Sequence, residues 1–215
     1  MKVLSTPKER ILKKIRQALS TSVPVPFPQS EGKESIFQQP ADEPAIEFAD
    51  RFTKLQGRFS YCLDEQEMLQ QLKVLIEARK WKKLFCRETN TQKMLVANGL
   101  ENSFYPELND CDASVTGCEY LIARTGSIVL SSGLQSGRTA SVYAPVHICI
   151  AYTDQLVYDI KDAINALKEN YKDHLPSLIT LATGPSRTAD IEKTLVVGVH
   201  GPKEVFCFLI ERDKV

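Results

Sequence analysis

The chain has 215 residues, of which 43% are apolar and 25% charged, and its 27 Lys and Arg residues balance its 27 Asp and Glu residues. A neutral chain of this composition is typical of a soluble globular protein, and it lacks the basic field that drives nucleic-acid binding. No stretch reaches the roughly 18 apolar residues that a membrane span needs. The first twenty residues are too basic for a signal-peptide core, so we expect a cytoplasmic protein with reduced thiols.

Residues 1–22 predict a basic amphipathic helix. Pro7 suits the first helical turn, and Ile11, Leu12, Ile15 and Leu19 recur at helical spacing. The apolar stripe is narrow, which favours packing on the body or on another subunit over a membrane surface. Residues 23–44 are rich in Pro without periodicity, which predicts a partly extended tether. The main domain is expected over residues 45–215.

Strand-like and helical segments alternate from residue 45. We expect helices at 45–55, from Asp64, and at 89–97, with strands at 58–62 and 83–86. The segments 114–116, 120–123 and 127–131 suit strands or a short helix between tight turns. A loop at 133–137 and a strand at 142–152 that Pro145 starts or interrupts follow them. A helix at 154–171, a buried strand at 178–182 and a strand at 204–210 complete the chain. This alternation predicts an α/β fold with a mostly parallel central sheet flanked by helices.

The segment Thr183-Gly-Pro-Ser-Arg-Thr188 follows an apolar strand and concentrates hydrogen-bond donors. Two hydroxyls, a guanidinium and free backbone N–H groups would share a small space. If residues 189–192 turn helical, those N–H groups also lie at the positive end of a helix dipole, which suits a carboxylate or a phosphate. The alternative is that Ser186 or Thr188 merely caps a short helix.

Six cysteines occur without a C-x-x-C pair, which argues against an iron–sulfur or zinc site within this chain. Cys86, Cys149 and Cys207 lie in apolar strand-like runs, where a thiol behaves as a small buried hydrophobe. Cys118 follows Gly117 in an expected loop and is the candidate for a reactive thiol.

The three histidines differ in setting. His174 lies in a polar segment and is expected in solvent, and His147 alternates with Val146 and Ile148, which favours a hydrogen-bonded structural role over a catalytic one. His200 is the strongest catalytic candidate, because the glycines around the Val199-His200 pair allow a close backbone approach. A turn needed only for its shape is the alternative.

Several motifs together resemble the LUD domain of the lactate-utilisation protein C family. They are Thr125-Gly126, Arg138, Pro145-Val-His-Ile148, the run from Gly184 to Glu192, and Gly198-Val-His-Gly-Pro202. The resemblance covers residue 45 to the C-terminus, and its last segment is the specific part. It implies the α/β fold shared by ribose-phosphate isomerases, glucosamine-phosphate deaminases and CoA transferases. It also implies a multi-subunit system that oxidises L-lactate to pyruvate, with the iron–sulfur clusters on partner subunits and no cofactor in this chain.

In such a fold the loops at Thr125, Arg138 and Thr183 are expected to meet at the carboxyl edge of the sheet. We therefore predict a small-anion site, with Asp190 and His200 as candidate catalytic residues. Its ligand-binding residues are predicted to be Thr125, Gly126, Arg138, Gly184, Ser186, Arg187 and Thr188. No metal ligand is expected.

One residue departs from the family pattern. Arg124 stands where members often have an acidic residue, and a guanidinium can bind or neutralise an anion but cannot act as a base or nucleophile. This favours a subunit that binds a small anion or assembles its redox partners. The alternative is a self-sufficient isomerase or CoA-transferase-like enzyme acting on a small phosphorylated or carboxylate substrate.

Overall fold

The computed structural model describes residues 6–20, 40, 42–188 and 196–212. The chain divides into two compact units, Met1–Gln38 and Gln39–Val215. The described part of the first unit is helix α1, Pro7–Leu19, which begins as predicted with Pro7 in its first turn. Thr6 and Glu9 form a reciprocal capping box at its start. None of the helices in the described ranges is long and apolar enough to cross a membrane.

The second unit contains five further α-helices among its described residues. They are α2 (Pro44–Lys54), α3 (Glu65–Arg79), α4 (Thr89–Leu95), α5 (Ala140–Tyr143) and α6 (Ile160–Tyr171). A π-helical turn, Val96–Leu100, extends α4, and 3-10 turns occupy Glu101–Ser103, Leu108–Asp110 and Thr153–Gln155.

Five parallel strands form the central sheet, in the order β1-β11-β6-β3-β2. Their bounds are β1 Arg58–Cys62, β2 Leu84–Phe85, β3 Ala113–Thr116, β6 Val146–Tyr152 and β11 Glu204–Ile210. The predicted parallel α/β sheet is therefore confirmed. The last strand of the chain lies inside the sheet, and Pro145 directly precedes β6, where a missing N–H costs the ladder nothing.

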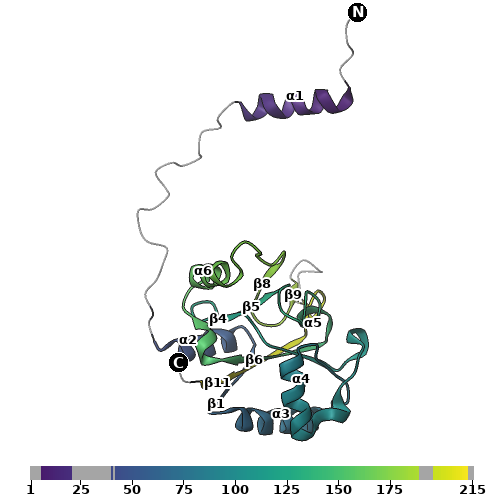
Figure 1. Cartoon of the computed structure of the whole chain (residues 1–215), viewed down its shortest axis with the longest axis vertical. Helices are drawn as coiled ribbons and strands as arrows, with labels where there is room; N and C mark the ends of the chain where they lie inside the picture. The colour runs from purple at the N-terminus through teal and green to yellow at the C-terminus, as the bar shows by residue number, and fades with distance from the viewer. Residues whose placement is uncertain (1–5, 21–39, 41, 189–195, 213–215) are drawn as a thin grey trace, which may run out of the picture. The chain divides into compact units, whose positions relative to one another are not determined.

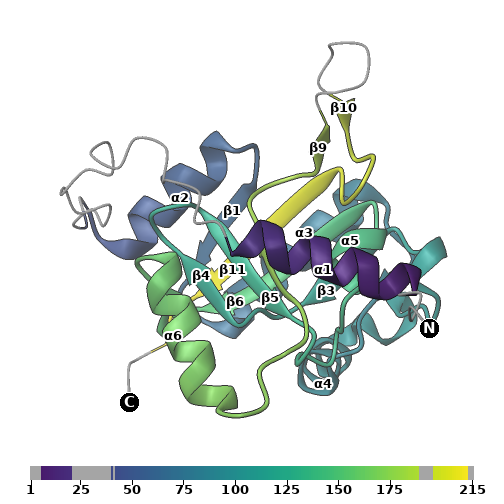
Figure 2. The same ribbon diagram turned by 90° about the horizontal axis from the view of Figure 1, so that it is seen from above.

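A second sheet of four strands lies over one face of the first (Figure 1). Its order is β7-β4-β5-β8, with β4 Tyr120–Ile122, β5 Ser127–Ser131, β7 Leu156–Val157 and β8 Ile179–Ala182. Strand β5 is antiparallel to both β4 and β8, and β7 is parallel to β4. Two short antiparallel strands, β9 (Arg187–Thr188) and β10 (Val196–Val197), form a ribbon that projects from the body (Figure 2).

The apolar side chains divide into layers around these sheets. One face of the parallel sheet packs on α3 through Met68, Leu72 and Ile76. The other face packs on α2 through Phe48 and Phe52 and on the inner face of the second sheet. Helix α6 covers the outer face of the second sheet, on the opposite side of the molecule from α3 (Figure 1).

Two sequence predictions in this region are wrong. The helix predicted from residue 154 begins at Ile160, because residues 153–155 form a 3-10 turn and Leu156 and Val157 pair with β4. The strand predicted as buried at 178–182 is β8, which lies at the edge of the second sheet with Leu181 exposed. Apolar runs of this length identify a strand without saying which sheet it joins.

Candidate functional site

The Thr125 and Thr183 segments, predicted to meet, do lie together. Ser127 links them, since its Oγ atom lies 2.8 Å from Thr125 Oγ1 and 2.9 Å from Thr183 Oγ1. Gly126 and Gly184 have φ angles of +61° and +81°, and a Cβ atom on either would lie 2.6 Å from backbone atoms at the end of α2. Both glycines therefore serve close packing against α2, where a side chain would collide.

Ser186 and Arg187 are engaged by the chain itself. The Ser186 N–H donates to the Pro202 carbonyl, and the Gly198 N–H donates to the Ser186 carbonyl. Arg187 Nη2 donates to the Leu55 carbonyl at 3.0 Å. Of the backbone N–H groups expected to be free in this segment, that of Ser186 is therefore hydrogen-bonded within the chain. This junction lies next to the starts of β1 and β11, at the amino edge of the parallel sheet.

Arg138 lies at the opposite end of the second sheet. Its Nη2 donates to Ser177 Oγ, just before β8 begins, whereas Thr183 follows the end of β8. The prediction that the Arg138 loop meets the Thr125 and Thr183 loops at one edge is therefore wrong. The carboxyl-edge rule applies to parallel strands, whereas β8 belongs to the second sheet and pairs antiparallel with β5.

Of the two further predicted site residues in this part of the sequence, the structure describes only Thr188. Thr188 pairs with Val196 in the ribbon. Asp190 and the helix suggested for residues 189–192 fall outside the described residues. Whether the segment binds an anion stays a prediction.

Arg124 neutralises a carboxylate of its own chain. Its Nε and Nη2 atoms donate to the two oxygens of Asp159 at 2.7 and 3.1 Å. Asp159 is buried and caps the start of α6, and the hydrogen bond from Arg124 lowers the pKa of this carboxyl. The guanidinium that departs from the family pattern therefore joins the second sheet to α6.

His147 has the structural role that its spacing favours. It is fully buried, and its Nε2 lies 2.8 Å from Thr116 Oγ1. Because the Thr116 hydroxyl donates to the Gly117 carbonyl, Nε2 carries the proton and donates to Thr116. Burial lowers the pKa of His147 to about 4, which keeps the ring neutral.

His174 and His200 are both exposed. His200 lines a cavity of about 400 Å³ together with Val142, Tyr143 and residues 198, 199 and 201. This cavity adjoins the start of β11. It contains none of the other predicted site residues.

A larger polar pocket opens at the carboxyl edge of the parallel sheet, and none of the predicted site residues lines it. It has a volume of about 610 Å³, and residues at or beyond the ends of all five strands line it. The lining residues are Glu65, Glu88, Asn90, Thr91, Met94, Gly117, Cys118, Leu134, Ile150, Tyr152, Asp154, Gln155 and Arg212. Ligands of open α/β sheets bind at this edge.

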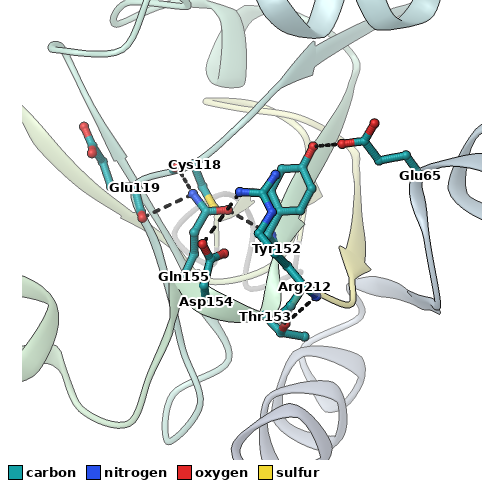
Figure 3. A network of polar contacts seen from close by, with 8 residues as sticks. All are labelled: Glu65, Cys118, Glu119, Tyr152, Thr153, Asp154, Gln155 and Arg212. Carbon is teal, nitrogen blue, oxygen red and sulfur yellow. Dashed lines mark hydrogen bonds and ion pairs between the residues drawn. The ribbon is translucent and has the colours of Figure 1, made fainter. Parts of the chain in front are cut away.

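Tyr152 and Arg212 form one wall of the pocket (Figure 3). The guanidinium carbon of Arg212 lies 3.5 Å from the centre of the Tyr152 ring, and its Nη1 lies 3.6 Å from Asp154 Oδ2. The Tyr152 hydroxyl donates to Glu65 Oε1 at 2.8 Å. Burial, followed by this hydrogen bond, raises the pKa of Tyr152 to about 12. These contacts join the ends of β1, β6 and β11.

Gln155 fixes the loop after β6 against the loop after β3. Its Oε1 accepts from the Tyr152 N–H at 2.9 Å, and its Nε2 donates to the Cys118 carbonyl at 2.6 Å (Figure 3). Both the oxygen and the nitrogen of the Gln155 amide are therefore hydrogen-bonded within the chain. The pocket wall is held in place by the chain's own hydrogen bonds.

Glu88 lies on the other side of the pocket, at the start of α4. Its Oε2 accepts from the Gly117 N–H at 2.7 Å and from the Thr91 hydroxyl at 3.2 Å. A Cβ on Gly117 would lie 3.0 Å from that oxygen, so glycine is what lets the carboxylate reach the backbone. The second oxygen, Oε1, is buried without a hydrogen-bond partner among the described residues.

The cysteines behave as buried apolar groups. All six are free and buried, as predicted for Cys86, Cys149 and Cys207. Cys118 is also buried, and its hydrogen bond with Cys149, together with burial, raises its pKa well above the usual value. The candidate reactive thiol is therefore held protonated. Among the described residues, no three His, Cys, Asp or Glu side chains gather in a metal-binding group.

The fold and pocket define an α/β protein whose parallel sheet offers a ligand-sized cavity at its carboxyl edge. The comparison with protein families specifies it further. The family model of the LUD domain matches residues 45–210, and the chain belongs to this family.

The similar proteins agree with this assignment. The chain is 36% identical over 102 residues to a lactate utilization protein C of Deinococcus radiodurans, covering 47% of each protein. It is 40% identical over 118 residues to a protein of that name from Geobacillus sp. strain WCH70, covering 54% of this chain and 48% of the relative. The chain thus spans about half the length of the curated relatives it matches.

A solved structure shares the fold. The crystal structure of a DUF162 family protein from Deinococcus radiodurans superposes with a TM-score of 0.58, covering 78% of this chain and 96% of that one. The sequence identity is 20%, so this likeness concerns the fold alone.

Proposed function

We propose that this protein is a subunit of an iron–sulfur-dependent system that oxidises L-lactate to pyruvate, and that it assembles the partners rather than carrying the redox centres. The observation that carries the proposal is membership of the LUD domain family, together with relatives named lactate utilization protein C. The cysteine spacing supports this division of labour, because the chain has no C-x-x-C pair.

Helix α1 supports the assembly role. Within its own unit it exposes Ile11 and Ile15 to 60% and 48%, and Leu12 to 40%, on a face bordered by basic residues. An amphipathic helix gains most of its stability when its apolar face packs on another surface. We propose that the iron–sulfur partner subunits supply that surface.

The small-anion role draws less support from the geometry. Arg138 and Arg187 lie at opposite ends of the second sheet, and each guanidinium donates to an acceptor of the same chain. An anion bound at the Thr183 segment would have to compete with the Leu55 carbonyl for Arg187. Assembly is therefore the role that we put forward.

The experiment compares the full chain with a variant that lacks residues 1–22, each co-expressed with candidate iron–sulfur subunits. We expect the full chain to co-purify with the partners and the deletion to lose them, while the melting temperature of the main domain stays unchanged. Lactate-dependent dye reduction should require the partners. Lactate oxidation by the isolated chain, or equal recovery of partners by the deletion, would contradict the proposal.

The self-sufficient enzyme is the second candidate, and the carboxyl-edge pocket favours it. Glu88 is a partly buried carboxylate beside a ligand-sized cavity, an arrangement that is common in catalytic sites. Turnover of an acyl-CoA and a free carboxylic acid by the isolated chain, abolished by Glu88→Gln, would favour this candidate over assembly.

A further inference from the structure

The carboxyl-edge pocket carries an excess of negative charge. Its lining holds three carboxylates, those of Glu65, Glu88 and Asp154, against one guanidinium, that of Arg212. Arg212 is already occupied, since it lies 3.6 Å from Asp154 and stacks on Tyr152. Its backbone is also fixed, because the Arg212 N–H donates to Thr153 Oγ1 and the Thr153 hydroxyl donates to the Arg212 carbonyl (Figure 3).

The charge balance selects against lactate, pyruvate and phosphate in this pocket, and it therefore also argues against the carboxylate substrates of the second candidate function. An anion would meet a lining with three carboxylates, and it would compete with Asp154 for the one guanidinium. Electrostatic interactions are stronger in a partly enclosed site than in open water. The lining therefore favours a ligand with positive charge.

Glu88 offers an acceptor that the protein leaves open. The Gly117 N–H and the Thr91 hydroxyl both donate to Oε2, whereas Oε1 is buried and receives no hydrogen bond from the described residues. A buried acceptor without a donor is destabilising, and a ligand that supplies an N–H group would remove this penalty. Glu88 itself lines the cavity, so a donor bound there lies beside this carboxylate.

Part of the lining is apolar. Met94, Leu134 and Ile150 belong to it. The volume of about 610 Å³ lies within the range of small-molecule sites.

We propose that the pocket at the carboxyl ends of the parallel strands binds a small organic cation, an amine or amidine attached to an apolar group, with Glu88 as the carboxylate that accepts from its N–H donors. This inference does not rest on the proposed function. The pocket can bind such a ligand whether or not the chain assembles with partners.

The test uses benzamidine and benzoate, which have nearly the same shape and opposite charge. Each is titrated at millimolar concentration into the full-length protein, and the methyl resonances of Met94, Leu134 and Ile150 report binding in the pocket. We expect benzamidine to shift these resonances and benzoate to leave them unchanged. Benzoate binding as tightly as benzamidine would overturn the proposal, as would the absence of binding by both.

Two variants then locate the contact. Glu88→Gln keeps an oxygen for the Gly117 N–H but removes the charge, and it should weaken benzamidine by at least about tenfold, as expected for the loss of a charge-assisted hydrogen bond. Glu77→Gln, on α3 and outside the lining, is the matched control and should leave the affinity unchanged. Thermal unfolding of both variants checks that they fold. Equal affinity for wild type and a folded Glu88→Gln would refute the role of Glu88.

Discussion

The ion pair between Arg124 and Asp159 permits a quantitative test of what joins the second sheet to α6. We propose a double-mutant cycle with Arg124→Met and Asp159→Asn, which remove the charges while keeping side chains of similar size. The two hydrogen bonds measure 2.7 and 3.1 Å, and the side chains are 27% and 9% exposed, respectively. The solvent exposure of this ion pair is therefore intermediate between that of surface ion pairs and that of buried ones.

Exposed pairs contribute up to about 1 kcal/mol, and breaking buried pairs costs about 3–5 kcal/mol. We expect each single variant to lower the free energy of unfolding by about 2 kcal/mol, with a coupling energy of at least about 1.5 kcal/mol. For a domain of this size the melting temperature should fall by about 4–8 °C. Urea unfolding at pH 7 and differential scanning calorimetry measure both quantities.

The coupling should also depend on pH. Because the folded state lowers the pKa of Asp159 below its ordinary value of 3.8, its contribution is present above that pH and is lost as the pH falls through the lower folded value. Lys54 and Asp50 form the matched control, since they lie 2.7 Å apart but their side chains are 66% and 50% exposed. Equal coupling energies for the two pairs would refute the reasoning from burial.

Two other predictions concern the core and the motif glycines. His147 has a folded pKa of about 4 against 6.5 when unfolded, so the unfolded state binds more protons between these values and stability falls as the pH drops from 6.5 to 4. In His147→Gln this decline should be smaller by about 2–3 kcal/mol in urea titrations at pH 4.5–7, and equal declines would contradict the assignment. Gly126→Ala should cost at least about 2 kcal/mol, because its Cβ would meet α2, whereas Gly137→Ala, with φ +68° and open space, should cost about 1 kcal/mol. Equal falls in melting temperature for the two variants would show that the positive φ angle, and not the contact with α2, determines the loss of stability.

The sequence predicts the parallel sheet because its strands have a strong local signature. Residues 148–152 and 205–210 are continuous apolar runs, as expected for strands covered on both faces. Asp64 caps α3 through the Glu67 N–H, a signal that lies within four residues of sequence. Such features depend on neighbouring residues alone.

The second sheet is less predictable because its strands depend on pairing between residues that are far apart in the sequence. Strand β7 has two residues and forms by pairing with β4, whereas its sequence alone predicts the start of a helix. The course of β8 likewise depends on pairing with β5, and that pairing sends the Thr183 segment away from the carboxyl edge. No local pattern encodes which of two sheets a strand joins.

The same reasoning explains why the motif residues and the pocket fall in different places. A short motif such as Thr183-Gly-Pro-Ser-Arg-Thr188 draws attention because its residues are adjacent, and here adjacency serves a tight junction against α2. The carboxyl-edge pocket instead collects single residues from segments up to about 150 positions apart, such as Glu65 and Arg212. A usable signal would have been the polar residues just beyond each predicted parallel strand, taken as a set. Only the strand order shows that this set shares one cavity, and that order becomes visible only once the fold is known.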